Sequence, residues 1–177
     1  FRLHVRAFWF SLGITLAGAG FGIFALIADP HAKKVIMPFE HLQVHPAERV
    51  KQEEGVMNDR LQGNKARFST SLMTHNTQVS VLTLALGMTW GIGTILVLFY
   101  NGVMLGAVAL DFVAAGQMPF LLGWLLPHGV IEIPAILLAG QAGLLLAGAL
   151  IGWGTRLPMK RRLRAIAPDL VTLMFGV

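Results

Sequence analysis

Two ionisable side chains, His128 and Glu132, have a spacing that could do chemistry in this 177-residue chain. They lie four residues apart in the apolar segment 119–134, so a helix there places both on one face, close enough for a hydrogen bond. An imidazole beside a carboxylate can be held neutral, relay a proton or supply two metal ligands. Two ligands do not complete a metal site, so His75 or Asp111 would have to converge on them. The structural alternative is that the two side chains neutralise each other and tie down an interrupted helix, and we predict neither a metal nor a cofactor.

Polar residues at the ends of the apolar blocks add to this pair. Asn101-Gly102 is interpreted as a turn in which Asn101 caps the helix that follows. The alternative is that its amide lines a polar cavity. His75-Asn76 can likewise cap a helix at the membrane interface. The resulting candidate functional cluster consists of His75, Asn76, Asn101, Gly102, Pro127, His128, Gly129 and Glu132.

The composition decides which class of protein must position these residues. Hydrophobic residues make up 55% of the chain, and Asp, Glu, Lys and Arg only 13%, against roughly 25% in soluble domains. Cysteine is absent, which excludes disulfide frameworks and thiolate chemistry. The net charge of +5 could indicate a nucleic-acid partner, yet no Lys or Arg occurs from residue 68 to residue 155. Basic residues that flank long apolar blocks, rather than covering one folded face, are typical of a multi-pass membrane protein and not of a nucleic-acid binder.

Four apolar blocks can cross a bilayer core, which takes about 20 residues in a helix. The predicted spans are 7–28, 79–100, 102–118 and 135–155. The segment 119–134 is interrupted by Pro127 and Gly129, and we interpret it as a broken or re-entrant helix. Basic residues favour the cytoplasmic side. The N-terminus and the basic cluster 156–164 are therefore both predicted to be cytoplasmic, which requires an even number of crossings.

The predicted fold class is all-α, a polytopic membrane helix bundle with about four to five membrane segments and one broken or re-entrant helix near 119–134. We predict a single integral membrane domain over 1–177, with an extracytoplasmic mixed-charge loop at 29–67 and a truncated further span from about 165. Glycines four residues apart permit close approach of membrane helices. The predicted helix-packing glycines are Gly18, Gly22, Gly87, Gly91, Gly102, Gly106, Gly148 and Gly152.

Three motifs occur in a recognisable order over about residues 2–164. They are His75-Asn76, then Asn101-Gly102 followed by Gly106, and finally the block Pro127-His128-Gly129-Val130-Ile131-Glu132. This order resembles the stage II sporulation protein M family, in which Asn-Asn is common at the position of His75-Asn76. The resemblance implies a protein of the bacterial cytoplasmic (inner) membrane. It also implies a scaffold that recruits envelope proteins, with relatives in circular-bacteriocin export and immunity systems.

Three functions fit these residues. The first is a non-enzymatic scaffold or assembly subunit, embedded in membrane lipid, that organises other membrane or envelope proteins or a second copy of itself through a glycine-packed bundle. The second is a transporter or export/immunity-type subunit with a polar site at the His128/Glu132 helix break. The third is an intramembrane metal-dependent hydrolase, which lacks an H-E-x-x-H signature. We favour the first and predict that the chain is not an enzyme.

Overall fold

Long apolar helices make up most of the structure. The computed structural model describes residues 4–37, 45–48, 50–51, 77–152 and 154–174, apart from the side chains of 30, 124–128 and 131. All regular structure within these residues is helical, which confirms the predicted all-α membrane fold. Helix α1 (Val5–Ala28), helix α6 (Ile92–Ala114) and the stretch Glu132–Ile151 are each long and apolar enough to cross a membrane. A shorter apolar helix, Thr77–Thr89, precedes α6.

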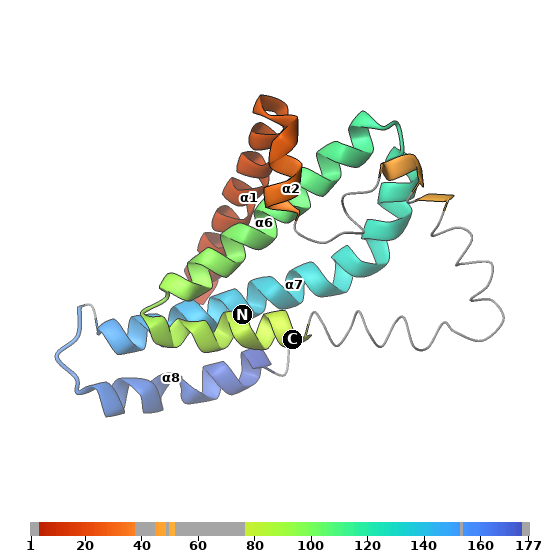
Figure 1. Cartoon of the computed structure of the whole chain (residues 1–177). Coiled ribbons are helices and arrows are strands. Elements are labelled where there is room, and N and C mark those ends of the chain that lie inside the picture. The colour runs from red at the N-terminus through yellow and green to blue at the C-terminus, as the bar shows by residue number, and fades with distance from the viewer. Residues whose placement is uncertain (1–3, 38–44, 49, 52–76, 153, 175–177) are drawn as a thin grey trace.

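Helices α1 and α6 pack side by side and run in the same direction (Figure 1). Glycines on each helix lie directly against the backbone of the other. The contacting pairs are Gly18 with Phe99, Gly22 with Val103, Gly102 with Thr15, and Gly106 with Ala19. A Cβ atom at any of these four glycines would overlap the facing carbonyl oxygen. Because lipid offers no hydrophobic force between helices, this close backbone packing is what stabilises the pair.

The chain turns sharply at Trp90 and Gly91. Their φ angles of 53° and 84° are both left-handed, and Gly91 is the N-cap of α6. The predicted spans 79–100 and 102–118 are therefore wrong in their boundaries, because α6 takes in residues from both. The turn predicted at Asn101-Gly102 is also wrong, since both residues lie inside α6.

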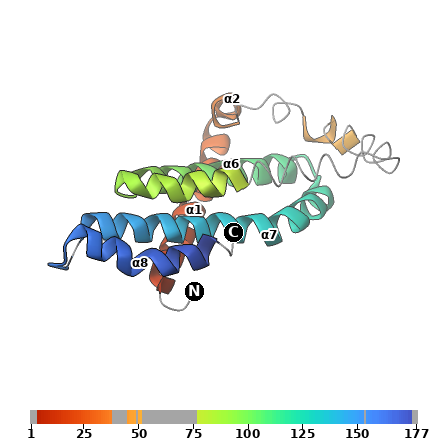
Figure 2. The same cartoon turned by 90° about the horizontal axis from the view of Figure 1, so that it is seen from below.

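Helix α7 (Met118–Ile151) contains 34 residues and includes the whole segment 119–134. The interruption expected there takes the form of a bend within one helix: the first part of α7 turns away from the rest (Figures 1 and 2). A proline inside a helix removes a backbone hydrogen bond and pushes against the preceding turn. The bend is therefore accounted for by Pro127 and Pro134, both of which lie inside α7.

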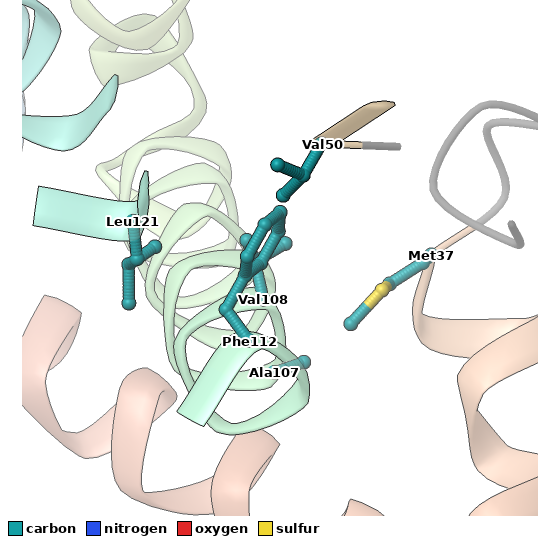
Figure 3. Packing of buried hydrophobic residues seen from close by; sticks show 6 residues of the cluster. All are labelled: Met37, Val50, Ala107, Val108, Phe112 and Leu121. Atoms are coloured by element: carbon teal, nitrogen blue, oxygen red, sulfur yellow. The ribbon is translucent and has the colours of Figure 1, made fainter. Parts of the chain in front are cut away.

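The segment after α1 folds back over the end of α6. It forms the 3-10 turn η2 (Pro30–Ala32) and the single helical turn α2 (Lys33–Ile36). A small apolar core then joins this segment to α6 and to the start of α7 (Figure 3). Its buried members are Met37, Val50, Ala107, Val108, Phe112 and Leu121. Most of the predicted loop 29–67 lies outside the described residues, and its extracytoplasmic location stays a prediction.

Helix α8 (Met159–Met174) lies along α7 (Figure 2). It is amphipathic: Leu173 is buried, whereas Lys160, Arg161 and Arg164 in its first turns are exposed. Two contacts hold it to the bundle. His4 Nε2 lies 2.9 Å from Asp169 Oδ2, and the Arg162 guanidinium donates to the Leu150 carbonyl oxygen at 3.3 Å. A further membrane span is predicted from about residue 165. The residues of that segment that the structure describes form the second half of α8.

Candidate functional site

Small and hydroxyl-bearing side chains are buried where α1 meets α6 and α7. Ser11 and Thr15 are buried on α1, and Gln141 is buried on α7. The two hydroxyls donate to carbonyl oxygens one turn earlier in α1, each at 3.0 Å. Gln141 Nε2 donates to the His4 carbonyl oxygen at 3.1 Å. The amide therefore ties α7 to the start of α1.

A second polar contact links the helix Thr77–Thr89 to α6. Thr94 Oγ1 donates to the Thr83 carbonyl oxygen at 2.8 Å, and both threonine side chains are fully buried. Gly143 of α7 lies beside this bond, since a Cβ there would come 2.6 Å from Thr94 Oγ1. These groups are neutral at every accessible pH. These hydroxyls can stabilise the contact between helices by hydrogen bonding, but they supply no acid or base for proton transfer.

An ion pair that the sequence analysis did not predict joins the two halves of the chain. Lys33 Nζ lies 2.8 Å from Asp111 Oδ2, across 78 positions of sequence. The side chains retain 19% and 17% of their exposure, so both charges are largely removed from solvent. An ionisable group in a membrane helix is costly unless it is paired, and α2 supplies the cation that Asp111 of α6 requires.

Two of the predicted site residues, Asn101 and Gly102, lie within α6. Asn101 Nδ2 donates to the Val97 carbonyl oxygen at 2.8 Å, so the amide bonds to its own helix and does not cap a helix start. Gly102 is buried against Thr15. Both residues are predicted members of the functional cluster, and the contacts described for them are those of helix packing.

The remaining predicted site residues are described only in part. His75 and Asn76 lie outside the described residues, and so do the side chains of Pro127 and His128. The predicted contact between His128 and Glu132 therefore stays a prediction. Gly129 and Glu132 are half-buried on α7. Among the described residues, no three His, Asp or Glu side chains come close enough to hold a metal ion.

The predicted packing glycines outside α1 and α6 have different surroundings. Gly87 lies against the backbone of Gly143, and Gly91 faces the Ala147 side chain. Gly148 has no neighbouring atom within 4 Å of a Cβ built on it. Gly152 ends α7 in the left-handed conformation, with φ of 72°, and the Arg162 guanidinium covers it.

Comparison with known proteins places this arrangement in a family. A model of the family described as stage II sporulation protein M matches residues 11–177. The chain belongs to the stage II sporulation protein M family. An uncharacterised protein of Methanocaldococcus jannaschii is 34% identical over 77 residues, which is 41% of this chain and 42% of that protein. The chain thus matches less than half the length of this relative, and no solved structure matches it.

Sequence reasoning missed the hydroxyl and amide contacts of this stage II sporulation protein M family member. Ser and Thr are common in membrane helices, so Ser11, Thr83 and Thr94 carried no distinctive pattern. One signal was present, because Gln141 lies between Gly140 and the pair Ala142-Gly143 in an otherwise apolar span. A large amide between small residues indicates a place where another helix approaches closely.

Proposed function

We propose that this stage II sporulation protein M family member is a non-catalytic assembly subunit of the cytoplasmic (inner) membrane, which organises partner proteins or further copies of itself. In this proposal the N-terminus and the cluster 156–164 are cytoplasmic. The bias of basic residues supports that orientation. The contact between His4 and Asp169 also supports it, because it brings the start of α1 to α8, the helix that contains most of the basic cluster.

The main support for this proposal is that α7 is longer than a helix needs to be to cross a membrane. A bilayer core takes about 20 helical residues, whereas α7 has 34, and the stretch Glu132–Ile151 alone is long enough to cross. The remaining residues, 118–131, turn away from the axis of that stretch. Leu121 packs against α6 in the apolar core, whereas other apolar side chains of this part stay exposed. Leu122 and Val130 retain 48% and 67% of their exposure there. A half-buried carboxylate, that of Glu132, follows directly. An acid in a membrane segment is costly unless it is paired, and a partner protein can supply that pairing where lipid tails cannot.

The interior of the bundle supports assembly over transport. Helices α1, α6 and α7 meet through backbone contacts at glycine and through neutral hydroxyl and amide groups. A transport path needs polar groups that line a hydrated site near the membrane midplane. Within the part of the chain that the structure describes, the bend of α7 is the feature that favours the transport alternative. It makes Glu132, rather than the glycine contacts, the residue to test.

Glu132→Gln is expected to reduce the assembled fraction of the chain by about tenfold. The exchange keeps the shape of the side chain and removes its charge, and one charge-assisted contact to a partner contributes on the order of 1.5–3 kcal/mol. The measurement is the fraction of chain that migrates in a complex on a native gel after gentle detergent extraction from membranes. Glu48→Gln is the matched control, because Glu48 is exposed and lies outside every helix long enough to span.

An unchanged assembled fraction in Glu132→Gln would contradict the proposal. Proton or ion flux into liposomes that contain the purified chain, lost on the same substitution, would instead establish the transport alternative. Equal losses in Glu132→Gln and Glu48→Gln would point to a general effect of charge.

A further inference from the structure

The connection between α7 and α8 presents a dense patch of positive charge. Arg156, Lys160, Arg161 and Arg164 are all exposed. These four residues are called the basic patch below. Arg162, in the middle of them, is turned inward: it covers Gly152 and donates to the Leu150 carbonyl oxygen. It thereby holds the start of α8 against the end of α7, while the four residues of the basic patch stay exposed on the surface.

The geometry of α8 keeps the basic patch separate from the packed side of the helix. With about 100° between successive residues, Lys160, Arg161 and Arg164 fall within one arc of roughly 100°. The half-buried or buried residues follow on the opposite side, where α8 meets α7: Leu163, Ile166, Leu170 and Leu173. The acid described on α8 is Asp169, which pairs with His4. No carboxylate on α8 therefore neutralises the patch.

We propose that the basic patch binds the phosphate groups of anionic phospholipids at the membrane surface. The patch begins five positions after Ile151, where the membrane-length stretch of α7 ends, so its charges lie at headgroup level. Arginine side chains match the geometry of phosphate oxygens. Two exposed apolar residues within the patch, Leu157 and Met159, are 50% and 52% exposed and can enter the acyl boundary beside the headgroups. This site is independent of the partner surface on α7.

Arg161→Gln/Arg164→Gln tests the site directly. The full chain is purified in a non-ionic detergent and titrated with phosphatidylglycerol or phosphatidylcholine at low ionic strength, and bound lipid is counted by native mass spectrometry. Each base near an anionic surface strengthens binding about fivefold. The double variant is expected to bind phosphatidylglycerol about 25-fold more weakly, with little change for phosphatidylcholine. Raising the salt concentration is expected to narrow the difference between the lipids.

Lys34→Gln/Lys51→Gln is the matched control, because it removes the same charge from two exposed bases outside the patch. Arg156→Gln/Lys160→Gln is the second test variant and serves if the first fails to fold. The control is expected to bind phosphatidylglycerol as the unmodified chain does, within about twofold.

Three results would overturn the proposal. The first is unchanged phosphatidylglycerol binding in both patch variants. The second is an equal loss in the control, which would reduce the effect to net charge. The third is displacement of the lipid by inorganic phosphate at matching concentration, which would make the patch a site for the free ion, or by a short single-stranded RNA, which would make it a nucleic-acid surface.

Discussion

Gly18→Val is expected to separate α1 from α6 and to lower the free energy of unfolding by about 3 kcal/mol or more, at the upper end of overpacking effects. A Cβ at Gly18 overlaps the carbonyl oxygen of Phe99, and backbone cannot move aside as a flexible side chain would. The two added methyl groups make the overlap larger. The measurement is equilibrium unfolding in mixed detergent micelles, followed by far-ultraviolet circular dichroism.

Gly20→Val is the matched control for Gly18→Val. The two glycines lie two residues apart in the same helix, so the change in helix propensity is the same. No atom lies within 4 Å of a Cβ at Gly20, and the control is expected to unfold within about 0.5 kcal/mol of the unmodified chain. Equal destabilisation by the two substitutions would mean that the observed helix contact does not hold α1 to α6.

Lys33→Met is expected to lower the free energy of unfolding by about 2 kcal/mol. Removing one partner of a buried ion pair costs about 3–5 kcal/mol because the other charge is left uncompensated. We reduce this range because 19% and 17% of the two side chains remain exposed. Asp111 would then be a lone carboxylate at the end of a membrane helix. The same unfolding measurement applies.

The neighbouring Lys34→Met provides the comparison. Lys34 is exposed, so its loss is expected to change stability by less than about 0.5 kcal/mol. The double variant Lys33→Met/Asp111→Leu is expected to be more stable than Lys33→Met alone, because the uncompensated charge is gone. A double variant as unstable as the sum of its single variants would show that the two side chains do not interact.

The bounds of a helix could be predicted from the sequence where an uninterrupted apolar run determines them. The predicted span 7–28 agrees with α1, because the run has no ionisable residue and no competing turn. The boundary predicted between two membrane spans at Asn101 was wrong for a physical reason. A membrane helix can satisfy an amide internally, as Asn101 does with Val97. The real turn uses the left-handed backbone of Trp90, which the tryptophan side chain gives no sign of.

The candidate site was less accessible to sequence reasoning than the fold. Pairing of Lys33 with Asp111 depends on the chain folding back after α1, and no local pattern encodes a contact 78 positions apart. Glycine spacing did carry structural information, because Gly18, Gly22, Gly102 and Gly106 all lie at one helix contact. The same spacing at Gly148 and Gly152 accompanies a helix end instead, since Gly152 is a C-cap.

Photo-crosslinking from position 130 in intact native membranes tests the proposed assembly role most directly. Val130 is 67% exposed on the bent part of α7, two residues before Glu132. A benzophenone amino acid introduced there is expected to give one discrete protein adduct that disappears in Glu132→Gln. The same probe at Leu16, which is 61% exposed on α1, is expected to label lipid. A position-130 probe that labels only lipid would contradict the account.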